Sequence, residues 1–312
     1  AVCMNEISPP NVGSPRIGPA YVELAAASNF SFLRGASHAE ELVVQASRLG
    51  LGGIAITDRN SLAGVVRGHM AAKEAGLAFA TGCRLVFMDS TPDILVWPQD
   101  RAAYAHLCEL LTTGKRRAPK GECHLTLDDL LTHGEGLLMA VVAPAAAAGA
   151  GLASVLEPLR KAFPDHLYLA LSRAHGGTDQ RHMASLARLA REHDLPLVAI
   201  GDVLYHAPER RPLQDVLTCI REGRTLASIG TRLEINAERH LKSHAEMLHL
   251  FRGYEAAVAQ AATLFGRIRF SLDELRYQYP DAPLFEELGP EPLPAQEALE
   301  KLTAIGLKKR YP

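Results

Sequence analysis

The sequence is poor in the features that mark secreted, membrane-bound or metal-stapled proteins. It has 5 cysteines, none of them in a C-x-x-C pair, so neither a disulfide framework nor a zinc ribbon is indicated. No apolar run approaches the roughly 20 residues that span a bilayer, because the alanine-rich stretch 143–153 is interrupted by Pro144. The first residues lack the basic-then-apolar order of a signal peptide. We therefore expect a cytoplasmic protein with no membrane contact.

The sequence also lacks an excess of charge of either sign. Its formal net charge is −2, so the whole chain carries no electrostatic signature of nucleic-acid binding, and any DNA contact must come from a local patch. The densest basic cluster is Lys115, Arg116, Arg117 and Lys120, in a segment flanked by glycine and proline. Such a loop could contact phosphates, meet another protein domain, or face solvent.

What is present is the composition of a globular protein with a large core, 47% hydrophobic and 22% charged. Short apolar runs alternate with amphipathic stretches, and Ser37 with Glu40 predicts the capped start of a helix. The alternation predicts an α/β protein of parallel strands with helical crossovers, either a closed barrel or an open sheet. The predicted strands are 21–27, 53–57, 78–87, 94–97, 136–142, 167–171 and 196–200.

Two acidic residues stand where predicted strands end. Asp58 follows the run 53–57, and Asp202 follows 196–200. In βα architectures, functional groups collect at the carboxyl ends of strands because the loops there converge on one face. A carboxylate at such a place can bind a cation or an arginine, or it can cap a turn.

Four long segments resemble the PHP (polymerase and histidinol phosphatase) domain that opens bacterial C-family polymerases. They are residues 28–44, 55–76, 111–131 and 201–223, and the runs NFSFLRGASH, KRRAPKGECHLT and HAPERRPLQDVLTCIREG are most similar to the error-prone (DnaE-like, ImuC-type) branch. The resemblance implies an α/β fold of the PHP type, a distorted seven-stranded (β/α) barrel with a helical C-terminal extension. It implies the barrel with its extension at 20–268 and the start of a polymerase palm at 269–312. The proline, glycine and serine residues of 1–19 predict a flexible segment before the barrel.

Active PHP domains hold metal ions at the strand ends and hydrolyse phosphoesters. The resemblance assigns eight positions of this sequence to that site. Only two of them are acids, and three are alanines, whose methyl groups cannot ligate a metal. We therefore expect a vestigial pocket without catalytic residues or metal, in which Arg59 and Arg84 pair with Asp58 and Asp202. The alternative is that both arginines face water. The eight positions are Ala25, Ala27, Asp58, Arg59, Arg84, Ala143, Asp202 and Leu204.

Other histidines leave an alternative open. A rearranged ligand set using His175 or His206 would give a metal-dependent phosphoesterase, such as a 3′–5′ proofreading exonuclease. The spacing of His240 and His244, with His249 nearby, is more typical of a solvated helix face than of a metal site. Cys123 beside His124 lacks an orienting acid, so we interpret that cysteine as incidental.

The resemblance implies a supporting role rather than chemistry for this chain. The domain would stabilise the downstream polymerase domains in damage-induced, mutagenic translesion synthesis, and the chain alone would neither incorporate nucleotides nor hydrolyse phosphoesters. No cofactor is expected for the chain itself, whereas the parent polymerase would use Mg²⁺. The expected partners are the downstream polymerase domains, DNA weakly or indirectly, and, through the full-length enzyme, the sliding clamp and accessory mutagenesis proteins.

Overall fold

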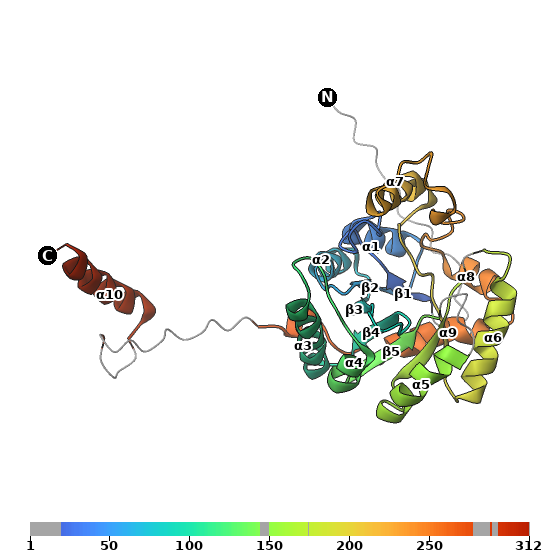
Figure 1. Cartoon of the computed structure of the whole chain (residues 1–312), viewed down its shortest axis with the longest axis horizontal. Helices are drawn as coiled ribbons and strands as arrows, with labels where there is room; N and C mark the ends of the chain where they lie inside the picture. Colours follow the sequence, from blue (N-terminus) through green and yellow to red (C-terminus); the bar gives the residue numbers. More distant parts are fainter. Residues whose placement is uncertain (1–19, 144–149, 174, 277–287, 289–292, 312) are drawn as a thin grey trace. The chain divides into compact units, whose positions relative to one another are not determined.

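The computed structural model describes residues 20–143, 150–173, 175–276, 288 and 293–311. The chain divides into two compact units, one ending at Glu274 and the other beginning at Leu275. The second unit contains α10 (Ala295–Arg310). The predicted flexible segment 1–19 lies outside the described residues, and the assignment of 269–312 to a polymerase palm stays a prediction. Figure 1 shows the elements of both units.

Seven strands form a single sheet in the order of the chain, which confirms the predicted number of strands and their places. A parallel bridge joins Ala26 to Val203, just beyond the last strand. Ala27 N donates to Val203 O at 2.9 Å, and Val203 N donates to Ala25 O at 2.8 Å. The curled sheet therefore brings its two edges together at one end, as the predicted distorted barrel requires. The strands are β1 (Val22–Ala26), β2 (Gly53–Arg59), β3 (Phe79–Leu85), β4 (Ile94–Pro98), β5 (Leu137–Val141), β6 (Leu167–Leu171) and β7 (Leu197–Ala199).

The prediction of parallel strands throughout is wrong for β4. This strand pairs antiparallel with both β3 and β5, whereas the other neighbouring strands pair parallel. A parallel connection needs a crossover of about a dozen residues or more. The segment 86–93 between β3 and β4 is shorter than that and contains no helix, so the chain turns back instead of crossing over.

Helices surround the sheet (Figure 1). The helix α1 begins after His38, whose N–H donates to the Glu41 carboxylate at 2.8 Å. The predicted cap of Ser37 with Glu40 is therefore one residue early, and Ser37 Oγ instead lies 2.8 Å from His206 Nδ1. The helices of the first unit are α1 (Ala39–Arg48), α2 (Val65–Ala75), α3 (Arg101–Arg117), α4 (Leu127–His133), α5 (Ala150–Ala162), α6 (Asp179–Glu192), α7 (Arg211–Glu222), α8 (His244–Leu250) and α9 (Glu255–Phe265).

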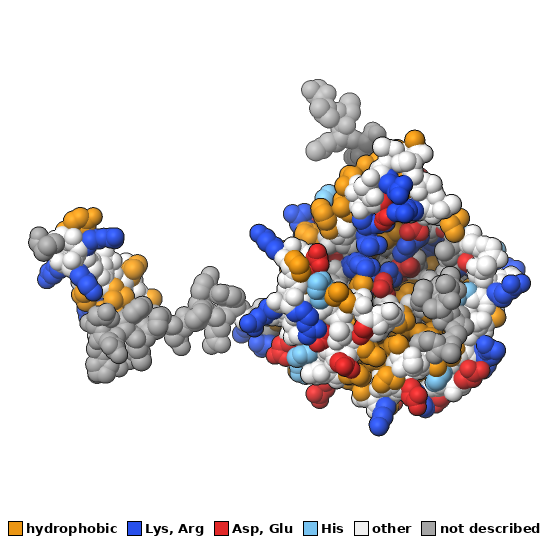
Figure 2. All heavy atoms as spheres, viewed as in Figure 1, with side chains coloured by type: hydrophobic (Ala, Val, Ile, Leu, Met, Phe, Trp, Pro, Cys, Tyr) orange, Lys and Arg blue, Asp and Glu red, His pale blue; other side chains and the backbone are white. Residues whose placement is uncertain are grey.

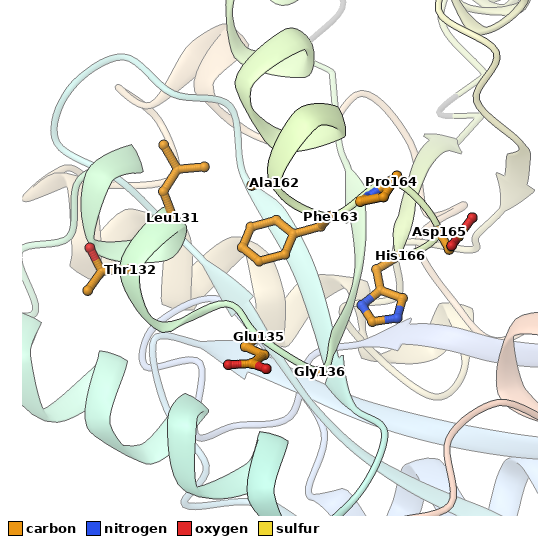
Figure 3. A pocket seen from close by; sticks show the side chains of 9 residues that line it. All are labelled: Leu131, Thr132, Glu135, Gly136, Ala162, Phe163, Pro164, Asp165 and His166. Atoms are coloured by element: carbon orange, nitrogen blue, oxygen red, sulfur yellow. The ribbon is translucent and has the colours of Figure 1, made fainter.

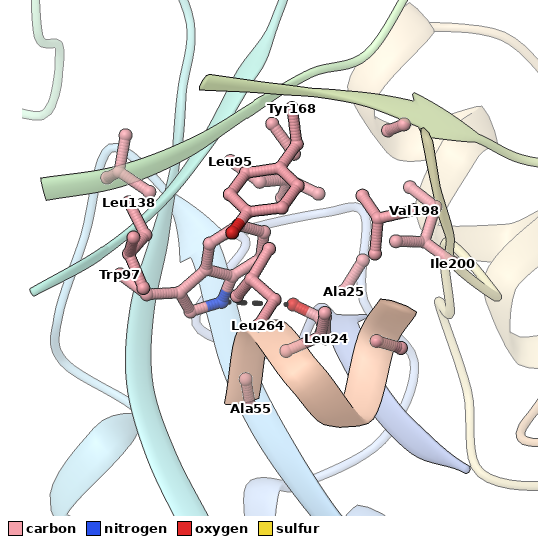
Figure 4. Packing of buried hydrophobic residues seen from close by; sticks show 14 of the residues in the cluster. Leu24, Ala25, Ala55, Leu95, Trp97, Leu138, Tyr168, Val198, Ile200 and Leu264 are labelled. Atoms are coloured by element: carbon pink, nitrogen blue, oxygen red, sulfur yellow. Dashed lines mark hydrogen bonds between the residues drawn. The ribbon is translucent and has the colours of Figure 1, made fainter. Parts of the chain in front are cut away.

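The core lies inside the curled sheet, around Trp97 of β4 (Figure 4). Trp97 is fully buried, and its indole N–H donates to Leu24 O at 3.2 Å. Leu264 of α9 and Tyr168 of β6 are buried beside it. Such side chains each contribute about 1.5–3 kcal/mol on burial. A Cβ on Gly82 would lie 2.6 Å from Trp97 Cδ1, so the glycine leaves the space that the indole ring occupies.

The helices of the described residues do not include one that is both long and apolar enough to cross a membrane.

Candidate functional site

A small cavity of about 70 Å³ lies at the end of the barrel where β1, β2 and β3 finish, which we call the barrel mouth. Four of the predicted pocket positions line it, namely Ala27, Arg59, Arg84 and Leu204. Ala25 and Ala143 are buried, 3% and 7% exposed, and are not among its lining residues. The remaining two positions, Asp58 and Asp202, contact residues of the lining.

The Asp202 carboxylate lies between two arginines. Arg84 Nη2 is 2.5 Å from Oδ1, and Arg239 Nη2 is 2.7 Å from Oδ2. Burial raises the pKa of Asp202, but the charges of Arg239 and Arg84 outweigh it and hold that pKa below its ordinary value. Asp202 has a positive φ of 49°, a left-handed conformation that Asp tolerates better than most residues. The predicted pairing of Asp202 with Arg84 is therefore present in the structure, and Arg239 is a second partner that the sequence did not indicate.

Asp58 does not pair with an arginine, which corrects the other half of that hypothesis. It is fully buried, and its Oδ1 accepts from Ser28 N at 2.8 Å and from Ser31 Oγ at 2.7 Å. Its Oδ2 accepts from Ser28 Oγ at 2.7 Å. Burial raises the pKa of Asp58, and the hydrogen bonds from Ser28 and Ser31 oppose that rise. The carboxylate therefore organises the loop that follows β1, with both oxygens engaged.

Arg59 turns away from Asp58 because consecutive residues of a strand point to opposite faces. Its guanidinium lies 3.7 Å from the Asp93 carboxylate, which Arg84 also approaches at 3.8 Å. Asp93 stands directly before β4, and the antiparallel course of β4 brings that residue to the barrel mouth. The alternative prediction, that both arginines face water, is wrong for Arg84, because its side chain is only 18% exposed.

Glu23 is a buried acid that the sequence analysis missed, although it is the one charge in the apolar run 21–27. It is 1% exposed and accepts from Ala25 N at 2.8 Å, Tyr21 Oη at 3.0 Å and Gly201 N at 3.0 Å. Burial, with a smaller contribution from the charge of Asp202, raises the pKa of Glu23 to about 7, although the hydrogen bonds that Glu23 accepts oppose the rise. Glu23 therefore joins β1 to the chain that leaves β7.

The histidines proposed as rearranged ligands bind other groups. His206 Nδ1 lies 2.8 Å from Ser37 Oγ, and burial lowers the pKa of His206. His175 Nε2 lies 3.5 Å from Glu238 Oε2. Across the described residues, no group of three or more His, Cys, Asp or Glu side chains could hold a metal ion.

The prediction that His240 and His244 share a helix face is wrong. The helix α8 begins at His244, after the cap residue Ser243. His240 lies before it, with Nδ1 2.9 Å from Ala237 O, whereas His244 Nδ1 accepts from Tyr21 N at 3.2 Å. The capping box of Ser243 with Glu246 sets this boundary.

The basic cluster is only partly a loop. Lys115, Arg116 and Arg117 form the exposed last turn of α3, and Lys120 lies beyond it. Cations near a helix C-terminus interact favourably with the helix dipole. Arg117 also donates two hydrogen bonds to Asp129, at 2.7 and 2.9 Å. The adjacent Cys123 is half-buried, and His124 Nε2 lies 2.8 Å from Glu122, so these neighbours have separate contacts.

A wider pocket of about 480 Å³ lies at the opposite end of the barrel (Figure 3). Glu135, Phe163 and His166 line it, next to the first residues of β5 and β6. It therefore lies at the amino ends of these strands, where a βα barrel does not place its functional groups.

Residues 23–174 match the family model described as PHP domain. This segment of the chain therefore belongs to the PHP-domain family. A protein named error-prone DNA polymerase from Caulobacter vibrioides is 47% identical over 305 residues, which cover 94% of this chain and 27% of that protein. A protein of the same name from Brucella abortus is 49% identical over 296 residues, covering 93% and 27%.

The resemblance to the PHP domain of an error-prone DNA polymerase is thus confirmed, and the chain spans about a quarter of the length of these relatives. Among solved structures, it is similar to an amidohydrolase from Chromobacterium violaceum, with 16% identity and a TM-score of 0.48. That match covers 60% of this chain and 88% of the other. A two-domain protein from Bacteroides vulgatus with a predicted PHP-like metal-dependent phosphoesterase is 12% identical, with a TM-score of 0.44, covering 77% and 68%.

Proposed function

We propose that this chain is a non-catalytic PHP domain whose metal site has been lost, and that it supports the polymerase domains of an error-prone DNA polymerase during translesion synthesis. The observation that carries the proposal is the cluster of Arg84, Asp202 and Arg239 at the barrel mouth. Fixed guanidinium groups there supply the positive charge that metal ions would otherwise bring to Asp202.

The residues at the barrel mouth do not suit a metal cluster. Divalent metals need several imidazole or carboxylate donors directed at one point. Both oxygens of Asp58 already accept hydrogen bonds from Ser28 and Ser31, and both oxygens of Asp202 face arginines. These oxygens are therefore not available to hold metal ions that would activate a water for hydrolysis.

Elemental analysis and activity assays test the loss of the metal site. The chain, purified after exposure to Zn²⁺ and Mn²⁺, is expected to retain less than stoichiometric metal. We also expect no turnover of phosphomonoesters or of single-stranded DNA ends with either ion added. Stoichiometric Zn²⁺ or Mn²⁺ together with turnover that a chelator removes would instead establish the phosphoesterase or proofreading exonuclease.

An exposed apolar stripe on α7 supports the structural role. Leu213, Val216 and Ile220 are 41%, 41% and 59% exposed, and α7 lies at the periphery of the first unit (Figure 1). The relatives extend far beyond the matched region, so we propose that polymerase domains further along such a chain cover this stripe. We assign the binding of Mg²⁺, DNA, the sliding clamp and the accessory mutagenesis proteins to the longer enzyme.

The role of the α7 stripe is tested with Ile220→Asp in two contexts. In the 312-residue chain the substitution should leave Tm unchanged, because the side chain is exposed. In a full-length polymerase that contains this domain, it should lower Tm and activity. An unchanged full-length enzyme would contradict the docking of polymerase domains on α7.

A further inference from the structure

Five arginines from separate parts of the chain line the small cavity at the barrel mouth. Arg34 comes from the loop after β1, Arg59 from β2, Arg84 from β3, Arg221 from α7, and Arg239 from the segment before α8. Figure 2 shows Lys and Arg side chains gathered in a hollow beneath α7. The five arginines therefore concentrate positive charge at one place in a chain whose formal net charge is −2.

The carboxylates around the cavity do not balance these five cations. Asp202 and Glu234 hold Arg84 and Arg239 at 2.5–3.0 Å, but Asp93 lies 3.7 Å from Arg59 and 3.8 Å from Arg84. Arg221 lies 3.3 Å from Glu222.

Arg34 differs from the other four arginines of the cavity, which all form ion pairs. Within the described part of the chain, its side chain makes no ion pair or hydrogen bond. Burial, together with the charges of Arg59 and Arg221, lowers the pKa of Arg34 to about 10, although the charge of Asp93 opposes this shift. A bound anion would relieve this crowding of like charges.

The backbone holds Arg34 at the cavity at some cost. The preceding residue, Leu33, has a φ of 57°, a left-handed conformation that costs a non-glycine residue roughly 1–2 kcal/mol. Arg221 Nη1 donates to Leu33 O at 2.9 Å, which fixes this conformation. On the other side, Gly35 approaches Ser28 so closely that a Cβ would lie 2.0 Å from Ser28 O. Strain of this kind persists where the surrounding structure enforces it, often at binding sites.

Gln214 supplies a further polar group. It lines the cavity and is 2% exposed, and its Oε1 has no hydrogen-bond partner among the described residues. Its Nε2 donates to Thr218 Oγ1 at 3.0 Å. Rotation of the amide would present the NH₂ group to the place that Oε1 now occupies.

We propose that this cavity binds a phosphate group, with Arg34, Arg59 and Arg221 as its principal contacts. Guanidinium groups bind phosphate oxygens in pairs of charge-assisted hydrogen bonds. The cavity volume of about 70 Å³ exceeds the roughly 10–15 Å³ needed for a single water, and suits a compact oxyanion. The phosphate is either the free ion or part of a nucleic-acid strand. Binding requires no metal and no hydrolysis, so the inference is independent of the supporting role proposed above.

Isothermal titration calorimetry of the 312-residue chain with inorganic phosphate, in the presence of a chelator, tests the proposal. We expect one binding site, and at least a tenfold weaker Kd in Arg34→Gln. The matched control is Arg188→Gln on α6, which removes the same charge from a side chain that is 68% exposed. Arg34→Gln should not lower Tm in phosphate-free buffer, because among the described residues the side chain makes no hydrogen bond or ion pair and is repelled by Arg59 and Arg221. Absence of phosphate binding by the wild type, or equal binding by Arg34→Gln, would overturn the site.

Competition with oligothymidylate identifies the source of the phosphate. A 5′-phosphorylated strand that competes with phosphate, when the unphosphorylated strand does not, indicates a terminal phosphate. Equal competition by both strands indicates backbone phosphates, and no competition by either indicates the free ion. In each case Arg34→Gln should raise the Kd of the ligand that binds. Competition that is unchanged in Arg34→Gln would contradict binding in this cavity.

Discussion

The Arg84 guanidinium lies 2.5 Å from the Asp202 carboxylate, although 118 residues separate them in the sequence. Arg84 belongs to β3, and Asp202 follows β7, the edge strand on the far side of the sheet. The ion pair therefore spans the barrel mouth, and it links parts of the sheet that do not pair through their backbones.

Asp202→Ala should destabilise the fold by roughly 3–5 kcal/mol, because it leaves Arg84 and Arg239 half-buried without their common partner. Urea unfolding measures this loss, with Asp165→Asn at an exposed carboxylate as the control. The pKa of Asp202 is held below its ordinary value, so its contribution is present above about pH 4 and is lost as the pH falls through the lower, folded-state pKa. A loss below about 1 kcal/mol would show that the pair contributes little.

Asp58→Ala should destabilise the fold by about 2–4 kcal/mol and leave the metal content unchanged. The substitution removes the acceptor for Ser28 N and for the hydroxyls of Ser28 and Ser31, all of them buried. Asp58→Asn should cost less, because its amide oxygen can still accept two of those hydrogen bonds. Unfolding curves and elemental analysis of both variants provide the comparison. Bound Zn²⁺ or Mn²⁺ that disappears in Asp58→Ala would mean that Asp58 is a ligand.

Glu23 should make the protein less stable as the pH rises through neutrality. Its folded-state pKa of about 7 lies above the ordinary value of 4.5, so the folded protein binds the proton more tightly than the unfolded chain does. This contribution, roughly 3 kcal/mol, is fully present below about pH 4.5 and is lost as the pH rises through about 7. Unfolding free energies from about pH 5 to about pH 8 should fall less steeply in Glu23→Gln. The exposed control Glu157→Gln should keep the wild-type slope, and a wild-type slope in Glu23→Gln would refute the assignment.

Gly82→Ala should destabilise the core by about 1–3 kcal/mol through overpacking. The new Cβ would lie 2.6 Å from Trp97 Cδ1 and 2.7 Å from Thr57 Cγ2, in a fully buried part of the sheet. Gly177→Ala is the control, since nothing lies within 4 Å of a Cβ there. Thermal unfolding with Trp97 fluorescence reports both the loss of stability and any displacement of the indole. Equal Tm values for the two variants would contradict the packing around Trp97.

The sequence determined where the strands lie and which acids follow them. Apolar runs are local signals, and strands buried on both faces are continuously apolar, so all seven were predicted within a few residues of their observed bounds. The direction of β4 is not visible in its apolar run, which is the same whichever way a strand runs, and only the short segment 86–93 before it indicates a reversal. The family was also evident, because its segments are long and ordered along the chain.

Only the tertiary structure decided which side chains meet at the barrel mouth. Asp58 and Arg59 are adjacent in β2 yet point to opposite faces, so Asp58 meets Ser28 and Ser31 while Arg59 faces Asp93. The second partner of Asp202, Arg239, comes from a segment without a recognisable motif. Strand pleating sets the face to which each side chain points, and loop conformation decides which segment, tens of residues away, that side chain meets. The sequence therefore shows which charged side chains stand at the strand ends, and the curl of the sheet decides which of them form ion pairs and hydrogen bonds.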